Sequence, residues 1–541
     1  MSEWTIERAA EVCFLDADDI LKALDIYTSA TTGGISLGVA TDQARNSIQA
    51  AQTVAALDSL MGFVQKKGDL MSARGGMAAA PYKTQEGKVS TYDGPGGPLP
   101  PYNMTQESIQ ERLGYQEYKG FASWQHSHIP TVLNAILTGE PYQPHVWIER
   151  SGNKMAMFGN SSSWLPAIQK LDFIMHSYMY PTSFTFEAAD VIFPITEWLE
   201  SVYSASRANL SCMRLDTTLL YEHCDDRFTW YTIIEKLAEL GDENAKKAWE
   251  WNVGYSNKEW DLYLKSLSFE GMTWEETRAL YPIKTMEEDE YWESLNYETF
   301  NDVGQDGTYA GFTGCAARDI KDSPKKNGIY CDAFVYLGRH GEEDFDLGPA
   351  SEDYPPIPHY LEPAESPLTD TEYPLALTEG RVMYYHHGTL RNNPWLRELY
   401  PAPELWIDPD AAAERGIVSG DWVNIKSRRC EQNEVVADGI YAVAYVTPGV
   451  SHGTVYMERF WNPEFLEDGA DARKSWTLTN VNVLTKNDPP YNREIGSYTL
   501  RGFQVEVTKS TRPEGVWYEP TDFEPWLPQP SDNTGGGYAV V

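Results

Sequence analysis

One stretch, residues 371–510, constrains the fold of this chain more than any other, because its cap and turn residues fall in a definite pattern. In WIDPDAAAERGIVSGDWVNIKS, Asp408 stands where a helix N-cap belongs and Pro409 follows at the first helical position, where its missing N–H costs nothing. Gly416 suits the left-handed residue that ends a helix, and 419–421 forms a tight turn into a strand. Read alone, the pattern predicts a helix–turn–strand unit among strands and short helices, and it indicates a fold rather than a chemistry.

A second segment, RVMYYHHGTLRNNP, follows a predicted strand at 381–385 and concentrates polar groups in a loop. Gly388 lets the backbone approach a ligand closely, and Thr389 can donate a hydrogen bond to a phosphate or a heterocycle. Arg391 can pair with a phosphate through parallel hydrogen bonds. For the pair His386-His387, taken alone, we favour a core or surface histidine beside one satisfied by the backbone over metal ligation.

Polar residues also stand near two later predicted strands. In VNVLT, Asn482 is predicted at a strand end, where its amide can donate and accept hydrogen bonds at the edge of a heterocycle. In YTLRGFQVEV, Arg501 comes just before the last predicted strand. The alternative for both is an ordinary polar residue at a strand edge.

The first half alternates helices and strands, which is the pattern of a doubly wound α/β sheet. Asp16 predicts the N-cap of a helix, and ISLGVA (35–40) predicts a short buried strand before a second helix that ends at Gly62. Further along, we predict helices over IPTVLNAIL and SSWLPAIQKL, and strands over PHVWIER, KMAMFGN, DFIMHSY and part of EAADVIFPITEWLE. The turns GVATDQARNS (38–47) and MFGNSSSW (157–164) place backbone amides at helix N-termini, which favour anions and polar ligands.

Composition limits the partners. The 541 residues are too many for one core and predict roughly three or four domains. The chain carries 80 acidic and 43 basic side chains, a net charge of −37, and no run of 18 apolar residues. We therefore expect no nucleic-acid partner and no direct membrane insertion. An anionic cofactor would need local basic groups, because the overall field repels it.

The N-terminus and the cysteines exclude further classes. MSEWTIERAAEV has no basic segment followed by an apolar one, so we expect no secretory signal and a cytoplasmic location, with translocation beside a signal-bearing partner left open. No two of the six cysteines have C-x2-C spacing, which argues against an iron–sulfur or zinc site built from this chain alone. A Cys315–Cys331 disulfide remains an alternative.

Taken in order, the three C-terminal segments resemble the cofactor-binding domain of the dimethyl sulfoxide reductase family, whose members hold molybdenum or tungsten between two molybdopterin guanine dinucleotides. The resemblance implies a Rossmann-like doubly wound sheet in segments, followed by a C-terminal double-psi β-barrel. It also implies a set of cofactor-binding residues, which we predict to be Gly38, Gln43, Gly159, Asn160, Ser161, His387, Gly388, Thr389, Arg391, Asn482 and Arg501. No residue of this chain is predicted as the metal ligand, and the catalytic residues stay unknown. One departure from the family is the absence of an acidic residue after the DFI strand, where members recognise guanine.

The resemblance and the composition together predict six regions. These are the end of a Rossmann-like domain (1–71), a Gly/Pro-rich loop or lid (72–125), a second Rossmann-like domain with an acidic, aromatic helical extension (126–300), a connector with a possible strand at 329–336 (301–370), the molybdopterin dinucleotide-binding β-barrel (371–510) and an extended tail (511–541). For the second region, the alternative is a disordered excursion.

The resemblance further implies an activity that requires protein beyond this chain. We expect the C-terminal, cofactor-binding portion of a molybdenum or tungsten oxidoreductase, inactive alone, whose iron–sulfur cluster and metal ligand lie in a missing N-terminal half or a companion polypeptide. An iron–sulfur electron-transfer subunit and a small-molecule substrate are the other expected partners. The YYHHGTLR segment is similar to members acting on hydroxylated aromatic rings, such as pyrogallol transhydroxylase and catechol dehydroxylases. The alternatives are a catalytically silent molybdopterin-binding module or remnant, and a barrel fused to an enzyme that uses another nucleotide.

Overall fold

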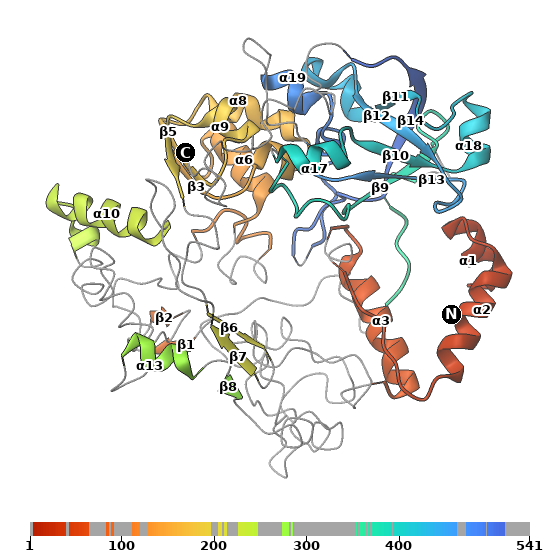
Figure 1. The fold of residues 1–541 in the computed structure, drawn as a ribbon, viewed down its shortest axis with the longest axis horizontal. Helices are drawn as coiled ribbons and strands as arrows, with labels where there is room; N and C mark the ends of the chain where they lie inside the picture. The colour runs from red at the N-terminus through yellow and green to blue at the C-terminus, as the bar shows by residue number, and fades with distance from the viewer. Residues whose placement is uncertain are drawn as a thin grey trace, which may run out of the picture.

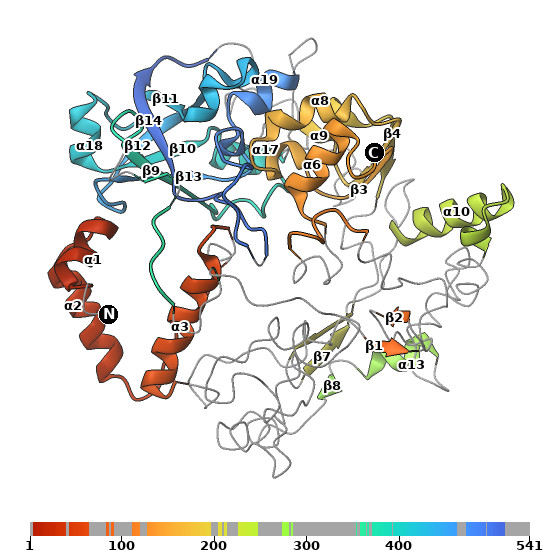
Figure 2. The ribbon, with the colours of Figure 1, turned by 180° about the vertical axis from the view of Figure 1, so that it is seen from behind.

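The structure is a computed structural model of the chain. It describes residues 4–38, 43–63, 83–85, 88–90, 111–118, 127–195, 204–207, 210–213, 226–246, 273–280, 283–284, 353, 358–363, 365–366, 370–391, 393–461, 472–493 and 495–513. The possible strand at 329–336, the Cys315–Cys331 pair, and most of the predicted lid, connector and tail lie outside these residues. The described parts form a mixed α/β protein with a closed barrel, as Figures 1 and 2 show.

The barrel closes in the strand order β10-β12-β11-β14-β9-β13. The β10–β12 and β13–β9 pairs are parallel, and the other neighbours are antiparallel. Its strands are β9 (Leu375–Gly380), β10 (Glu404–Ile407), β11 (Trp422–Lys426), β12 (Ile440–Val446), β13 (Thr454–Glu458) and β14 (Phe503–Ser510). Alternate residues of β9 point inward, and Val423 and Ile425 of β11 are fully buried. Each such aliphatic side chain contributes about 1.5–3 kcal/mol through burial.

Short helices connect the barrel strands: α17 (Pro394–Leu399), α18 (Pro409–Glu414), η6 (Arg428–Glu431), η7 (Glu434–Val436), α19 (Ala472–Thr477) and η8 (Val481–Val483). The start of α18 confirms the predicted cap, because the Asp408 carboxylate accepts hydrogen bonds from Asp410 N and Ala411 N. Gly416 has φ +62° and Gly420 has φ +91°, the left-handed conformation that each turn requires.

The sheet unit is a three-stranded parallel sheet in the order β3-β4-β5, formed by Val146–Arg150, Phe173–Tyr178 and Val191–Pro194. Four helices and a 3-10 turn accompany it: α6 (Ile129–Thr138), α7 (Lys154–Met157), η2 (Ser161–Trp164), α8 (Leu165–Ile168) and α9 (Ser183–Ala188). The strand predicted over KMAMFGN is wrong, because 154–157 form α7. Met155 and Ala156 are fully buried there, and periodicity cannot distinguish a buried helical turn from a buried strand in so short an apolar run.

The N-terminal segment contributes helices. These are α1 (Ile6–Cys13), α2 (Ala17–Ser29) and α3 (Ser47–Met61). Asp16 caps α2 as predicted, since its carboxylate accepts from Asp18 N at 2.8 Å. The strand predicted at 35–40 is wrong over 35–38, which are irregular and carry an exposed Leu37. No neighbouring strand is described for these residues, and an apolar run forms a strand only where a partner supplies hydrogen bonds.

The barrel and the sheet unit share one hydrophobic core. Trp164, Ile174 and Phe184 from the sheet unit belong to the same buried cluster as Leu377 and Val505 from the barrel. Both views show the sheet unit beside the barrel, with α1–α3 lying below it (Figures 1 and 2). Contacts of α7 and η2 with η8, and of α9 with α19, link the two parts. The polar residues at this contact are therefore held by a common core.

Smaller elements complete the described residues: β1 (Lys83–Gln85), β2 (Lys88–Ser90), β6 (Ser204–Arg207), β7 (Leu210–Met213), β8 (Ile283–Lys284), α10 (Asp226–Glu239) and α13 (Trp274–Ala279). β1 pairs with β2, and β6, β7 and β8 form an antiparallel sheet. Among the described helices, none combines the length and the apolar character needed to span a bilayer.

Candidate functional site

The loop after α7 meets the loop after η8 at a contact that we call the junction. The backbone N–H of Asn160 donates to Thr485 Oγ1 at 3.2 Å, and the Asn482 side-chain amide donates to the carbonyl oxygen of Ala156 at 2.6 Å. A Cβ atom at Gly159 would lie 2.5 Å from the carbonyl oxygen of Lys486. This close approach requires glycine at position 159, so two turns far apart in sequence are fixed against each other.

Local conformation explains how the sheet side of the junction is built. Asn160 has φ +44°, a left-handed value that asparagine tolerates better than most residues, and it reverses the chain between α7 and η2. The Ser163 hydroxyl donates to the Asn160 carbonyl oxygen at 2.7 Å. Ser161 is completely buried, and its hydroxyl has no hydrogen-bond partner among the described residues. The predicted residues 159–161 therefore lie together, with one buried polar atom left over.

The barrel side of the junction differs from the prediction in its secondary structure. Asn482 was predicted at a strand end, and it lies instead in the 3-10 helix η8, where it is 1% exposed. The Asn480 side chain explains the change, because its carbonyl oxygen accepts from Asn482 N at 3.0 Å and caps the turn. The side-chain nitrogen of Asn482 donates a hydrogen bond, whereas its Oδ1 has no hydrogen-bond partner among the described residues.

Gln43, from the N-terminal segment, joins the same junction. Leu500 N donates to the Gln43 carbonyl oxygen at 3.0 Å, and Ser497 Oγ donates to the Ala44 carbonyl oxygen at 2.9 Å. The Gln43 side-chain oxygen is buried without a partner in the described part of the chain. Gly38 is exposed, and a Cβ atom there would meet nothing within 4 Å.

The loop after β9 begins earlier than predicted. β9 ends at Gly380, so the strand predicted at 381–385 is wrong; the backbone turns at 381 because β13, its parallel partner, also ends there, at Glu458. His387 has φ +54°, and its Nε2 lies 2.9 Å from the Arg381 guanidinium. Gly388 faces open space, and the Thr389 hydroxyl donates to the carbonyl oxygen of His386.

Arg391, which we predicted to contact a phosphate, has several partners within the chain. Its side chain is 2% exposed, forms an ion pair with the buried Glu458, and donates to the carbonyl oxygens of His387 and Arg459 at 2.8 and 3.0 Å. The guanidinium also lies 4.4 Å from the ring centroid of Tyr385. The carboxylate and the carbonyls hold Arg391 against the loop, and its contact with a phosphate stays a prediction.

A second group, which we call the arginine cluster, was largely missed from the sequence. It comprises Arg381, Arg459, Arg501, His387 and Glu379. Only His387 and Arg501 were predicted, whereas Glu379 is the next-to-last residue of the strand LALTEG, at a position that points into the barrel. A charged residue at an inward strand position can be recognised in the sequence, and it would have indicated this cluster.

Electrostatics mark this cluster as unusual. Burial raises the pKa of Glu379 to about 7, although the charges of Arg501 and Arg459 lower it. Burial, followed by the charge of Arg501, lowers the pKa of Arg459. The pKa of His387 is lowered by burial and by the neighbouring charges of Arg381 and Arg459. The basic groups therefore repel one another, and an anion bound among them would relieve that repulsion.

Buried polar atoms without partners show that these residues fit a polar cofactor. Among the described residues, Gln43 Oε1, Ser161 Oγ, Asn482 Oδ1 and Arg501 Nε are all buried and all lack a hydrogen-bond partner. Buried polar groups are almost always paired in folded proteins. These four atoms come from four separate segments, and all four residues were predicted to contact the cofactor. A ligand with both donors and acceptors along its edge would satisfy them.

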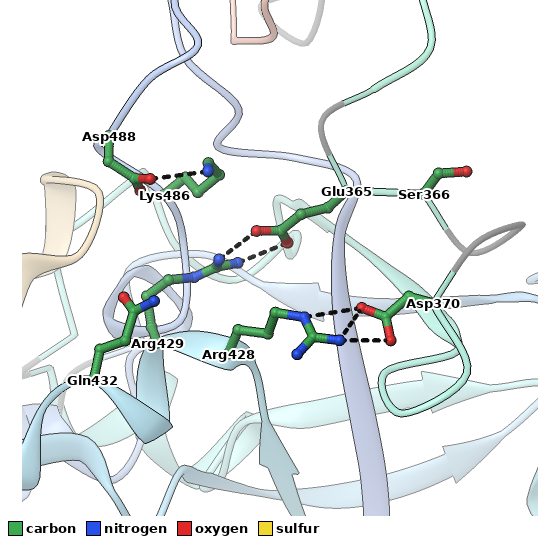
Figure 3. Close-up of a pocket in the computed structure, with 8 residues that line it drawn as sticks. All are labelled: Glu365, Ser366, Asp370, Arg428, Arg429, Gln432, Lys486 and Asp488. Atoms are coloured by element: carbon green, nitrogen blue, oxygen red, sulfur yellow. Dashed lines mark hydrogen bonds and ion pairs between the residues drawn. The ribbon is translucent and has the colours of Figure 1, made fainter.

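A polar cavity of about 320 Å³ lies beside the junction. Figure 3 shows its lining of paired charges, with Arg429 on Glu365, Arg428 on Asp370 and Lys486 on Asp488. None of the residues that line it was predicted as a site residue. Because each cation in the cavity already has a carboxylate, it offers no excess positive charge to an anion. Within the described residues, no three His, Cys, Asp or Glu side chains gather as metal ligands would.

Comparisons with known proteins show what the chain is similar to. Residues 375–496 match the model of the molydopterin dinucleotide binding domain. Dopamine dehydroxylase from Eggerthella lenta is 25% identical over 99% of this chain and 54% of its own length. Acetylene hydratase from Syntrophotalea acetylenica is 21% identical over 93% of this chain and 64% of its own.

A solved structure has the same fold. Acetylene hydratase from Pelobacter acetylenicus superimposes with a TM-score of 0.67 over 94% of this chain and 65% of that chain, at 18% sequence identity. The chain spans about half the length of the first curated relatives it matches. Residues 375–496 thus match a molybdopterin dinucleotide-binding domain, and the chain is similar to molybdopterin enzymes of the dimethyl sulfoxide reductase family, among which dopamine dehydroxylase fits the hydroxylated-ring resemblance.

Proposed function

We propose that this chain binds the two molybdopterin guanine dinucleotides of a molybdenum or tungsten oxidoreductase and holds one of them at the junction. The observation that carries the proposal is the set of four buried, unpartnered polar atoms on Gln43, Ser161, Asn482 and Arg501. When bound, the cofactor would supply the redox chemistry of its metal. The part of this chain would be to bind, orient and shield it.

Each of these four residues has a definite task in this proposal. Gln43 and Asn482 present a carbonyl oxygen to donors on the ligand, Ser161 presents a hydroxyl that can donate or accept, and Arg501 presents an N–H. The cofactor is an anion, and the chain carries a net charge of −37, so the local charges of the arginine cluster are needed to offset the repulsion. We further propose that the barrel is of the double-psi kind and that the sheet unit belongs to a Rossmann-like domain.

The activity would require further polypeptide, and this is also a proposal. Large apolar side chains remain exposed on the sheet unit, among them Val146, Ile148 and Ile192, and α2 has no buried residue at all. Parallel sheets are normally covered on both faces, so these surfaces favour a companion polypeptide that carries the metal ligand and an iron–sulfur cluster. The similarity to dopamine dehydroxylase favours a hydroxylated aromatic compound as the small-molecule substrate.

Pterin release tests the proposal directly. The chain would be produced in a host that makes the cofactor, alone and beside a candidate companion, then denatured in acid and oxidised so that released pterin fluoresces. We expect pterin together with molybdenum or tungsten in the assembled protein, and substrate-dependent electron transfer only there. Protein that folds and associates but carries no pterin would contradict the assignment.

A matched pair of variants tests the junction itself. Gln43→Met removes the unpartnered oxygen at similar side-chain volume, and we expect retained pterin to fall roughly fivefold, the loss of about 1 kcal/mol of hydrogen bonding. Gln432→Met, at the cavity of paired charges, is the control and should retain the wild-type amount. Equal retention in both variants would remove Gln43 from the site.

A further inference from the structure

Glu379 is a buried acid for which the proposed function gives no role. Its side chain points into the barrel near the end of β9, and the residue is 4% exposed. Its Oε2 has no hydrogen-bond partner among the described residues. A carboxylate in such a place is costly unless a charge or a proton compensates it. A compensating charge would have to come from the strands that flank β9 on either side.

Strand register brings an arginine to each side of Glu379. On the antiparallel side, Phe503 pairs with Leu377 and Gly502 N donates to the Leu377 carbonyl oxygen at 2.8 Å, so continuing the ladder places Arg501 opposite Glu379. On the parallel side, Met457 pairs with Glu379, and Arg459 N donates to the Gly380 carbonyl oxygen at 3.0 Å. Neither arginine forms a direct ion pair with Glu379 in the described structure.

The other charged groups around Glu379 do not neutralise this arrangement. Tyr456 on β13 also interacts electrostatically with Glu379. Arg381 and His387 in turn interact electrostatically with Arg459. Glu458, the other nearby carboxylate, is committed to Arg391. Arg459 Nε and Arg501 Nε are buried without partners among the described residues. The cluster therefore combines unsatisfied donors with one acid placed between them.

We propose that Arg459 and Arg501, with Arg381 and His387, bind a phosphate-class anion, and that Glu379 takes up a proton from solvent when the anion binds. The inference rests on the proposed function insofar as the natural anion would be a phosphate of the dinucleotide. Before binding, ionised Glu379 offsets part of the arginine charge. Once the anion has replaced it as counter-charge, the ionised carboxylate only repels the ligand, so its protonation favours the complex.

The expected consequence is an anion affinity that falls as pH rises. Because burial raises the pKa of Glu379 to about 7, the acid changes charge close to neutral pH. Below that pH the carboxyl is already neutral and binding is strongest. Above it, each bound anion must bring a proton with it, so affinity declines by about tenfold for each further pH unit.

Sulfate is a suitable probe, because its charge does not change near neutral pH. Titration calorimetry of the full chain at pH 6 and pH 8 would give dissociation constants, and runs in two buffers of different ionisation heat would give the protons taken up. We expect binding roughly tenfold weaker at pH 8 than at pH 6, with net proton uptake at pH 8. Sulfate that does not bind, or that binds equally at both pH values without proton uptake, would overturn the proposal.

Variants assign the effect to individual side chains. Glu379→Gln should bind sulfate equally at both pH values, at the strength of the wild type at pH 6. His387→Gln should bind more weakly but keep the pH dependence, which separates the acid from the histidine. Arg459→Gln or Arg501→Gln should lose sulfate binding, whereas Arg415→Gln, whose partner Glu506 lies elsewhere on the barrel, should keep it. A pH dependence that persists in Glu379→Gln would refute the role of the acid, and the wild-type proton count tests it even if that variant misfolds.

The two proposals fail in different ways. Pterin in the assembled protein together with pH-independent sulfate binding would refute proton uptake and leave the proposed function standing. Proton-linked sulfate binding in a protein that never carries pterin would leave the anion site standing and refute the cofactor assignment.

Discussion

Two groups of buried charges near one end of the barrel differ in how they are satisfied. Arg391 and Glu458 form a direct ion pair, and carbonyl oxygens accept hydrogen bonds from Nε and Nη2 of the arginine. Arg459 follows Glu458 in the chain, and neither it nor Arg501 forms a direct ion pair with Glu379 in the described structure. Both groups leave side-chain atoms without hydrogen-bond partners among the described residues, so the direct ion pair is what separates them. Burial of charge therefore points to a binding site where the opposite charges do not meet.

The largest effect that we expect concerns the satisfied pair. Glu458→Leu leaves the Arg391 charge buried without a counter-charge, so the free energy of unfolding should fall by about 3–5 kcal/mol. Urea unfolding of the chain would measure it. The double variant Arg391→Met/Glu458→Leu is the control and should recover much of the loss. A single variant as stable as wild type would place Arg391–Glu458 in the same class as the arginine cluster.

The next effect concerns the unsatisfied group and pH. The pKa of Glu379 is raised to about 7 from a usual value of 4.5, so the folded chain holds a proton that the unfolded chain has lost between these values. Its contribution to stability is fully present below pH 4.5 and is lost as pH rises through 7. Urea midpoints at pH 5 and pH 8 should therefore differ less in Glu379→Gln than in wild type. An unchanged difference would mean that Glu379 is ionised throughout.

Close packing at the junction gives a smaller effect. Gly159→Ala would place a methyl group 2.5 Å from the Lys486 carbonyl oxygen, and we expect destabilisation of about 1–3 kcal/mol. Gly388→Ala is the matched control, because its Cβ would face open space and thermal unfolding should be nearly unchanged. Equal melting temperatures for the two variants would contradict the contact between the sheet unit and the barrel.

The smallest effect that we expect is at a more accessible ion pair. Arg415 pairs with Glu506 at 2.9 Å, and their side chains are 16% and 29% exposed. Arg415→Gln should change stability by no more than about 1 kcal/mol, because water compensates charges at such positions. A loss comparable to that of Glu458→Leu would show that exposure does not separate the two classes of ion pair.

Much of the local structure followed from the sequence where one residue decides it. Asp408, Pro409 and Gly416 each act within a few residues, and each was found in its predicted place. The errors fall where distant contacts decide. Residues 154–157 are helical, with Met155 and Ala156 buried in the common core region, and Asn482 lies in a 3-10 turn capped by Asn480. Local propensity cannot report such packing.

The candidate site divides in the same way. The sequence nominated Gln43, Ser161, Asn482 and Arg501 as separate polar residues, and it also nominated Arg391, a phosphate ligand by its chemistry. Which of these side chains keep a free atom depends on neighbours that folding brings together.

The sequence by itself therefore determined the strand that follows the 419–421 turn, the last barrel strand, the caps and turns of the barrel, and the polar types placed at its loops. Only the tertiary structure decided that Arg391 is paired with Glu458 and that Glu379 lies between Arg459 and Arg501. Caps and turns are settled by hydrogen bonds over a few residues. Pairing of buried charges depends on residues that are between 67 positions (391 and 458) and 122 positions (379 and 501) apart in the chain, and no local pattern encodes that distance.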